Sequence, residues 1–137
     1  MKPVRWGVLS TAKIARERVI PAMQQSKLCV IHGIASREPA KAKKTADDLG
    51  IKNTYDSYEE LIADPEIEAV YNPLPNHLHV PWSIRAAAAG KHVLCEKPIA
   101  MNANEARDLV TTRDKCGVLI EEAFMPRHHP QWKRVRE

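Results

Sequence analysis

A lysine stands directly after an apolar run that is typical of a buried strand. The run extends from His92 to Cys95, and Glu96, Lys97 and Pro98 follow it. In open α/β sheets, ligands bind at the carboxyl ends of the strands. A lysine ammonium at that edge can polarise a carbonyl oxygen or donate a proton to a developing alkoxide. We therefore predict that Lys97 is a catalytic acid, with a surface lysine beside a helix-breaking proline as the alternative.

A turn rich in small residues follows the first apolar run, which extends from Arg5 to Leu9. Ser10, Ala12 and Ala15 stand where a dinucleotide-binding fold carries the three glycines of G-x-G-x-x-G. Small residues allow a tight turn and a close approach of backbone N–H groups to a pyrophosphate, and the next helix directs its positive dipole end to the same point. An ordinary strand-to-helix turn would explain the stretch equally well. The predicted phosphate-binding residues are Ser10, Thr11, Ala12, Lys13 and Ile14.

The second apolar run, from Leu28 to Ala35, is followed by a serine and an arginine. NAD-dependent enzymes usually carry an acidic residue at this point to hold the ribose hydroxyls. Ser36 and Arg37 suit a 2′-phosphate instead, because a guanidinium pairs with phosphate oxygens bidentately, and Lys41 adds a further charge. These residues favour NADP, with NAD as the alternative cofactor, although neighbouring Glu38 weakens the preference. A solvated turn is the alternative role for Arg37.

Strand-like and helix-like segments alternate along the whole chain, which is typical of repeated βαβ units around a parallel sheet. The expected strands cover residues 5–9, 28–35, 54–55, 69–72, 92–96 and 118–123. The expected helices cover residues 14–26, 39–49, 57–63, 78–89 and 102–116, and another begins at Pro130. Pro21 is expected to bend the first helix or end it early. The fold class is therefore predicted as α/β, a doubly wound parallel sheet of the Rossmann type.

Helix boundaries are marked by local signals. Glycine follows three of the expected helices, at Gly50, Gly90 and Gly117. Two helices are preceded by capping pairs, which are Ser57 with Glu60 and Asn102 with Glu105. These signals support the assigned ranges independently of the apolar periodicity.

The last residues of the chain are expected to begin a connection to further structure. Residues 1–123 are predicted to form one nucleotide-binding domain, and residues 124–137 to begin an interdomain crossing. The helix that begins at Pro130 has about two turns, which is marginal without a packing partner. We therefore expect this end to need a neighbouring structure.

Composition excludes several classes of protein. With 137 residues, 44% of them apolar, the chain can build a packed core, so disorder is not expected. No apolar run is long enough for a membrane span and the N-terminus lacks the apolar segment of a secretion signal, so we expect a cytoplasmic protein without a membrane partner. Three widely separated cysteines indicate neither a disulfide framework nor a zinc site. His77 and His79 lack a third metal ligand, so no metal is expected.

The net charge of +4 is concentrated at one end, because residues 126–137 contribute +3 of it. A short basic end is more often a solvated helix face than a reader of nucleic acid. We expect no nucleic-acid partner, with a basic nucleic-acid adaptor as a lesser alternative.

Five ordered segments together carry a family resemblance, and they are residues 9–14, 35–37, 71–79, 90–98 and 122–125. They resemble the family of glucose-fructose oxidoreductase, inositol dehydrogenase and MocA proteins (Gfo/Idh/MocA), specifically its N-terminal NAD(P)-binding domain. The Asn-Pro-Leu-Pro-Asn block at 72–76 and the Glu-Lys-Pro block at 96–98 are the most specific. Within the family, the chain is most similar to the dihydrodiol dehydrogenase, xylose dehydrogenase and anhydrofructose reductase branch. The resemblance implies an NAD(P)-dependent oxidoreductase that transfers hydride to or from a sugar or cyclic alcohol.

The resemblance also assigns roles to individual residues. Lys97 matches the catalytic lysine of the family, and Glu96 matches the residue beside the nicotinamide ribose. Pro98 matches a proline that often follows a cis peptide bond. A loop is expected to line the nicotinamide side of the cofactor through Asn72, Leu74, Asn76 and His79.

Proteins of this family have a second, α/β domain that completes the substrate pocket and mediates assembly. The resemblance implies that this substrate domain is missing from this chain and that residues 124–137 begin the crossing toward it. The resemblance therefore implies a small-molecule substrate and a homo-oligomer for the two-domain form. The 137-residue chain alone is expected to be incomplete for turnover. The alternative is a stand-alone NADP-binding regulatory module without turnover.

Overall fold

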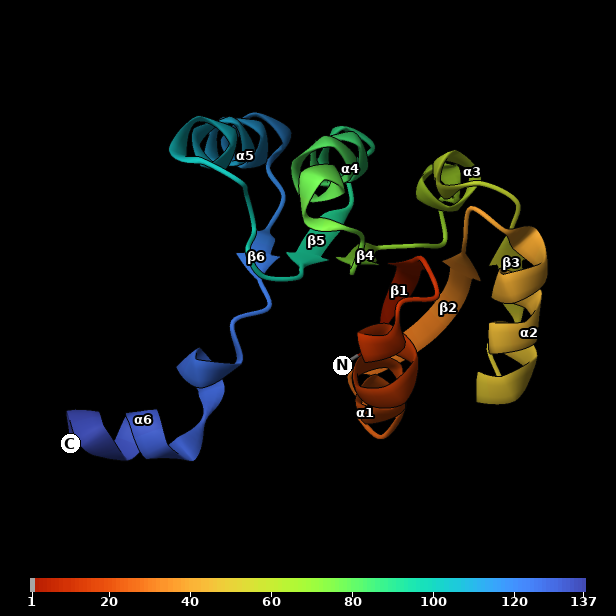
Figure 1. The fold of residues 1–137 in the computed structure, drawn as a ribbon, viewed down its shortest axis with the longest axis horizontal. Helices are drawn as coiled ribbons and strands as arrows, with labels where there is room; N and C mark the ends of the chain where they lie inside the picture. Colours follow the sequence, from red (N-terminus) through yellow and green to blue (C-terminus); the bar gives the residue numbers. More distant parts are fainter. Residues whose placement is uncertain (1) are drawn as a thin grey trace.

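The computed structural model describes residues 2–137, except for the side chain of Lys133. Within that range, six strands form one sheet, in which all neighbouring strands run parallel in the order β3-β2-β1-β4-β5-β6 (Figure 1). The strands are β1 (Val4–Leu9), β2 (Cys29–Ala35), β3 (Asn53–Tyr55), β4 (Ala69–Asn72), β5 (His92–Cys95) and β6 (Ile120–Glu122). The order changes direction between β1 and β4, which is where open α/β sheets bind ligands. The predicted doubly wound parallel sheet is confirmed.

Helices cover both faces of the sheet (Figure 1). A π-helical turn, η1 (Ala15–Val19), leads into α1 (Ile20–Gln24), and these lie with α2 (Pro39–Leu49) on one face. The other face carries α3 (Tyr58–Ala63), α4 (Asn76–Ala88) and α5 (Ala103–Cys116). After β6, a 3-10 helix, η2 (Met125–His128), and α6 (Pro130–Arg136) extend away from the sheet.

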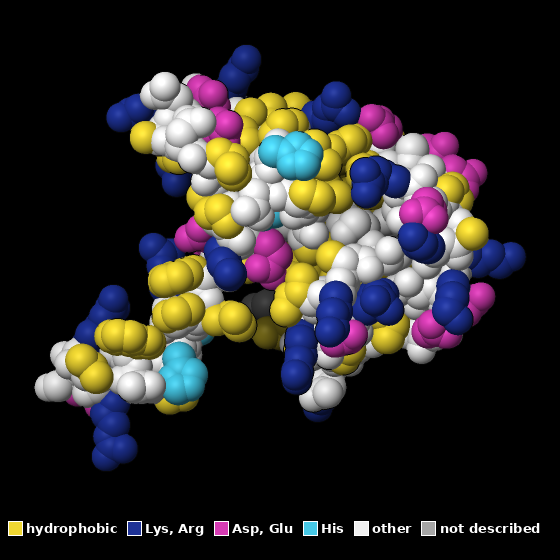
Figure 2. Space-filling view, in the orientation of Figure 1, with side chains coloured by type: hydrophobic (Ala, Val, Ile, Leu, Met, Phe, Trp, Pro, Cys, Tyr) yellow, Lys and Arg dark blue, Asp and Glu magenta, His cyan; other side chains and the backbone are white. Residues whose placement is uncertain are grey.

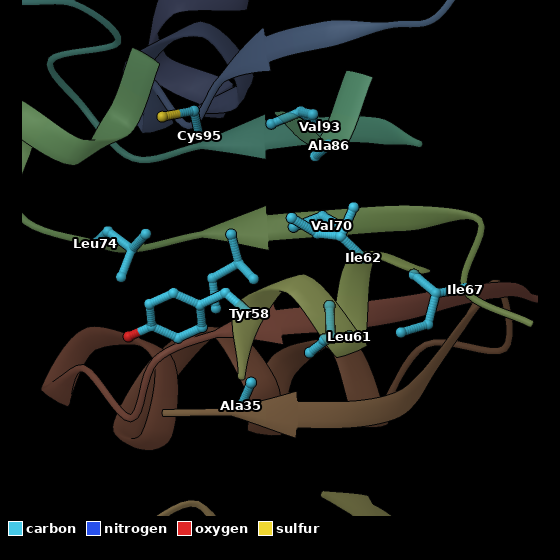
Figure 3. Close-up of a cluster of buried hydrophobic side chains, with 11 residues drawn as sticks. Ala35, Tyr58, Leu61, Ile62, Ile67, Val70, Leu74, Ala86, Val93 and Cys95 are labelled. Atoms are coloured by element: carbon cyan, nitrogen blue, oxygen red, sulfur yellow. The ribbon is translucent and has the colours of Figure 1, made fainter. Parts of the chain in front are cut away.

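Two clusters of buried apolar side chains join these helix layers to the sheet. Successive residues of a strand point to opposite faces, so Val70 belongs to the cluster on the α3 side, whereas Tyr71 belongs to the cluster on the α1 side. Figure 3 shows the first cluster, into which Leu61 and Ile62 of α3 point together with Val70. Strands with apolar side chains buried on both faces are typical of parallel sheets.

The predicted helix signals act at the expected positions. The Ser57 hydroxyl accepts a hydrogen bond from the Glu60 N–H at 3.1 Å, and Asn102 Oδ1 accepts one from the Glu105 N–H at 3.0 Å. Gly117 follows α5 with φ of 65°, in the left-handed region that favours glycine. The start of α3 and both ends of α5 therefore follow from local sequence.

The first helix differs from the expected continuous segment 14–26. The Ile20 N–H donates to the carbonyl of Ala15, five residues back, and Pro21 then lies in the first turn of α1. Proline fits there because first-turn N–H groups have no intrahelical partner. Other bounds shift by one to two residues: α4 begins at Asn76, β5 ends at Cys95, and β6 covers only residues 120–122. The 3-10 helix η2 was not expected.

Candidate functional site

The sheet brings the predicted lysine and the predicted phosphate turn to the same edge. Ser10 follows β1 and Lys97 lies two residues beyond β5, and all six strands run in one direction. Ser36 and Arg37 follow β2 at that edge as well. The loop after β4 lies at the switch point between these segments. Four separated parts of the sequence therefore converge on one side of the sheet.

The turn after β1 is held in a tight conformation by its own residues. Ser10 has φ of 91°, and among residues 2–137 it is the one non-glycine residue with positive φ. This position corresponds to the first glycine of the dinucleotide motif, where such a backbone is favoured by glycine. The Ser10 hydroxyl accepts from the Ala12 N–H at 3.2 Å, and Arg16 Nε donates to the Thr11 carbonyl at 3.0 Å. The turn is thus formed without a glycine.

The helix that follows this turn lies close against the sheet. Ala15, at the third glycine position of the motif, is fully buried in the core cluster on the α1 side. Lys13 and Ile14 are exposed, and Lys13 Nζ lies 4.0 Å from Glu17. The turn therefore combines a buried small residue with an accessible first helical turn, as the dinucleotide motif requires.

Of the two predicted cationic residues that follow β2, Arg37 and Lys41, one has no ion-pair partner among the described residues. Ser36 is buried, and its hydroxyl accepts from the Glu38 N–H at 3.3 Å. Lys41 Nζ lies 2.6 Å from Glu38 Oε1, so the carboxylate offsets the charge of Lys41. Arg37 is exposed and forms no ion pair with another residue in the described part of the chain. Of the two predicted cations, Arg37 is the one available to an anionic group.

A groove of about 1080 Å³ runs from the carboxyl edge of β4 and β5 toward the C-terminal tail. In Figure 2 the surface is hollowed between the main body and that tail. Six predicted site residues line the groove, and they are Ile14, Leu74, Asn76, His79, Glu96 and Lys97. Eight lie outside its lining, and they are Ser10, Thr11, Ala12, Lys13, Ser36, Arg37, Lys41 and Asn72. The predicted residues thus separate into a groove set and an outer set.

Lys97 is an exposed residue on a loop whose other residues are tied down. The Lys97–Pro98 peptide bond is cis, as the resemblance implied. The Ile99 N–H donates to Glu122 Oε1 at 2.9 Å, which joins the loop to β6. The Glu96 N–H donates to the Asn72 carbonyl at 3.0 Å, which joins it to β4. The lysine is therefore an exposed side chain on an anchored backbone.

Glu96 is held by a tyrosine from the neighbouring strand. The Tyr71 hydroxyl donates to Glu96 Oε1 at 2.6 Å, and Tyr71 itself is fully buried. Burial, and then the hydrogen bond and negative charge of Glu96, raise the pKa of Tyr71 above its usual range. The phenol therefore remains a donor to the carboxylate.

His79 and Asn72 act from inside the loop after β4. His79 is 1% exposed, with Nδ1 2.7 Å from the Pro98 carbonyl oxygen and Nε2 2.6 Å from that of Leu74. Asn72 is fully buried, and its Nδ2 donates to the His79 carbonyl at 3.0 Å and to Ser83 Oγ at 3.1 Å. Both side chains were predicted to face the cofactor, but their polar atoms contact other protein groups instead. They hold the shape of the loop from which Leu74 and Asn76 face the groove.

The remaining polar candidates near the groove do not supply a nucleophile or a metal site. Burial raises the pKa of the Cys95 thiol to about 12, so it stays protonated at neutral pH. Within residues 2–137, no group of three or more His, Cys, Asp or Glu side chains is placed to hold a metal ion. No helix in that range is long and apolar enough to cross a membrane.

Sequence reasoning missed Tyr71, Glu122 and Arg16. Tyr71 was placed in the strand at 69–72 and in the family segment 71–79 without a role for its side chain. Its contact with Glu96 depends on the pairing of β4 with β5, in which Tyr71 lies beside Leu94. Glu122 was placed in the strand at 118–123 and in the family segment 122–125, also without a role, and its contact with Ile99 depends in the same way on the pairing of β5 with β6. A sequence without known strand neighbours carries no signal for either contact.

Comparisons with known proteins agree with this geometry. The family model described as "Oxidoreductase family, NAD-binding Rossmann fold" (GFO_IDH_MocA) matches residues 4–124. The chain is 53% identical over 135 residues to an uncharacterized oxidoreductase, ORF334, of Rhizobium meliloti, and 47% identical over 132 residues to D-xylose 1-dehydrogenase (NADP(+)) 2 of Haloferax volcanii. These matches cover 98% and 96% of this chain but 40% of each relative.

A solved structure is similar over nearly the whole chain. KijD10, a 3-ketoreductase from Actinomadura kijaniata in complex with NADP and TDP-benzene, matches with a TM-score of 0.93 and 39% sequence identity. The match covers 97% of this chain and 41% of the KijD10 chain. The chain thus spans about two fifths of the length of the relatives it matches.

Proposed function

This chain belongs to the Gfo/Idh/MocA oxidoreductase family, and from that membership we propose that it is the nucleotide-binding domain of an NADP-dependent oxidoreductase acting on a sugar or cyclic alcohol. The observation that carries the proposal is the position of Lys97 on the same groove edge as the loop after β4, at the end of the sheet that carries the Ser10 turn. A cationic amine, a phosphate-binding turn and a switch-point groove are the parts that a nicotinamide-dependent site requires.

The residues present fit NADP at its phosphate positions. The Ser10 backbone already has the φ that the dinucleotide motif uses, and buried Ala15 allows the helix to lie close to the sheet. Arg37, without a carboxylate partner in the described chain, suits a 2′-phosphate. The Haloferax xylose dehydrogenase is named for NADP(+), and the KijD10 structure contains NADP. NADP is accordingly proposed here, with NAD as the weaker ligand.

Within that site, Lys97 acts as the acid. NADP supplies or accepts the hydride when it is bound. Lys97 Nζ polarises the reacting oxygen of the substrate and holds the proton that this oxygen gains or loses. The hydrogen bond from the Ile99 N–H to Glu122 anchors the loop from which the lysine reaches into the groove. Fixed positioning of this kind lowers the barrier because less orientational freedom is lost during the reaction.

We also propose a division of the chain at the end of β6. Residues 1–123 form the nucleotide domain, and residues 124–137 lead toward a substrate domain in a longer protein. Four apolar side chains of this segment are exposed away from the sheet, and they are Phe124, Met125, Trp132 and Val135. Such side chains suit a segment covered by further structure. We assign assembly into a homo-oligomer to that two-domain form, and a cytoplasmic location to the protein, whose three cysteines are all unpaired.

Titration of the purified chain with NADPH and NADH tests the proposal. Cofactor fluorescence and calorimetry should both report saturable binding, with NADPH bound at least tenfold more tightly than NADH. Absence of binding to either nucleotide would overturn the proposed function. Tighter binding of NADH would overturn the choice of NADP while leaving the oxidoreductase assignment in place.

A further inference from the structure

We propose that Tyr71 is a positioning residue that fixes Glu96 as an acceptor for a hydroxyl of the nicotinamide-side ribose. The inference rests on the proposed cofactor site and names a residue to which neither the motif nor the family match assigns a role. Tyr71 lies along the wall of the groove but is fully buried, and its hydroxyl is bound to Glu96. It acts through the Glu96 carboxylate, which lines the groove beside Lys97.

The contact is geometrically well defined. Tyr71 lies on β4 beside Leu94 of β5, and Asn72 lies beside Cys95, so the two strands end in register just before Glu96. The Glu96 N–H donates to the Asn72 carbonyl at 3.0 Å, which fixes the backbone. The Tyr71 hydroxyl then fixes the side chain at 2.6 Å. Distances in this range are typical of strong hydrogen bonds between a hydroxyl and a carboxylate.

The tyrosine engages one carboxylate oxygen only. Glu96 Oε1 accepts from Tyr71, and Glu96 Oε2 has no hydrogen-bond partner among the described residues. A carboxylate has about four acceptor sites, so a half-buried Glu96 retains the capacity to accept from a ligand hydroxyl. Burial keeps Tyr71 protonated, which makes it a donor at neutral pH. The arrangement therefore suits a ribose hydroxyl as the third partner.

A purely structural role would have different consequences. The Tyr71 ring is a member of the core cluster on the α1 side, so its packing contributes to stability whatever its hydroxyl does. Tyr71→Phe keeps the ring and removes only the donor. A general loss of packing would weaken the binding of every nucleotide. A loss that is confined to nucleotides with the nicotinamide-side ribose therefore reports on Glu96.

The experiment compares two nucleotides on four forms of the chain. NADPH carries the nicotinamide ribose, whereas adenosine 2′,5′-bisphosphate lacks it and retains the 2′-phosphate. Tyr71→Phe should weaken NADPH by about fivefold to tenfold, the net effect of one typical hydrogen bond, and change the bisphosphate by less than about twofold. Glu96→Gln should show the same selectivity. The double variant should be no weaker than Glu96→Gln alone, because the two residues act as one unit.

Tyr55→Phe is a matched control. Tyr55 also donates its hydroxyl to a carboxylate, that of Asp64, but neither residue lines the groove. This variant should bind both nucleotides as the wild type does. Equal NADPH affinity in wild type and Tyr71→Phe, or equal losses for both nucleotides, would overturn the inference. If Tyr71→Phe fails to fold, Glu96→Gln that binds both nucleotides as the wild type does would still overturn the inference, because Tyr71 acts through Glu96. Wild type that binds neither nucleotide would refute the proposed function itself.

Discussion

His79 Nδ1 lies 2.7 Å from the carbonyl oxygen of Pro98, so a buried ring of α4 is joined to the loop that bears the proposed acid. The other ring nitrogen lies 2.6 Å from the Leu74 carbonyl. One side chain thus connects the loop after β4 with the loop after β5. The two loops at the edge of the groove are therefore joined by a side chain that is 1% exposed.

Replacing this histidine should therefore destabilise the fold as well as the site. His79→Phe removes the imidazole that lies against the buried Leu74 carbonyl and the part-buried Pro98 carbonyl, and the loss of its hydrogen bonding should lower the free energy of unfolding by roughly 1–3 kcal/mol. Urea denaturation monitored by circular dichroism measures this. His77→Phe serves as the control, because His77 is exposed and its replacement should change stability by less than about 0.5 kcal/mol. Equal stability of the two variants would contradict the bridging role.

Lys97→Ala should separate cofactor binding from chemistry. In this chain, NADPH affinity should stay within about twofold of wild type, as it should in Lys52→Ala, a control at an exposed site outside the groove. In a two-domain relative, replacement of the matching lysine should lower the turnover number by about 10²-fold to 10⁴-fold, the usual contribution of a general acid. Steady-state kinetics measure the second effect. Undiminished turnover would remove Lys97 from the mechanism.

Arg37 and Lys41 should contribute unequally to recognition of the 2′-phosphate. Arg37→Ala should weaken NADPH by about tenfold or more and leave NADH unchanged, since a bidentate charged pair is lost. Lys41→Ala should weaken NADPH by less than about threefold, because Glu38 already neutralises this exposed lysine. Competitive titration with both cofactors measures these ratios. A larger effect at Lys41 than at Arg37 would show that the ion pair with Glu38 opens on binding.

Asp64 should make the fold sensitive to acid at a point outside the groove. The hydrogen bond from Tyr55, followed by that from the Glu66 N–H, holds the pKa of Asp64 below its usual range. Its stabilising contribution is therefore complete above the unfolded value of about 3.9, and it is lost as pH falls through the lower folded value.

Denaturation of wild type and Asp64→Asn between pH 7 and pH 2 measures this contribution. The difference in unfolding free energy should be constant above about pH 5 and should shrink as the pH falls below about 4. Asp108→Asn is the control, because Asp108 is exposed and has no ion-pair or hydrogen-bond partner among the described residues. A difference that is independent of pH would contradict the lowered pKa.

Local signals in the sequence were sufficient for the elements of the fold. The helix Pro39–Leu49 and the strand Ala69–Asn72 have their predicted bounds, because proline at a helix start, glycine after a helix and an apolar run act over a few residues. The π-turn before Pro21 was not predicted, since helical periodicity does not distinguish hydrogen bonds to the fourth residue from those to the fifth.

The candidate site could be predicted only in part, for a related reason. The motif identified the residues that follow strands, such as Ser10 and Lys97. It did not show that His79 turns both ring nitrogens to backbone carbonyls or that Tyr71 holds Glu96, because those contacts depend on how distant segments pack. Residue type indicates what chemistry a side chain can do, and the packing decides where its hydrogen bonds are made.

The bond between Ile99 and Glu122 links the acid loop to the last strand. Glu122 is two residues before Phe124, where the chain leaves the sheet. The segment after β6 and the backbone around Lys97 therefore share one anchor, so that loss of the Glu122 carboxylate would loosen both at once.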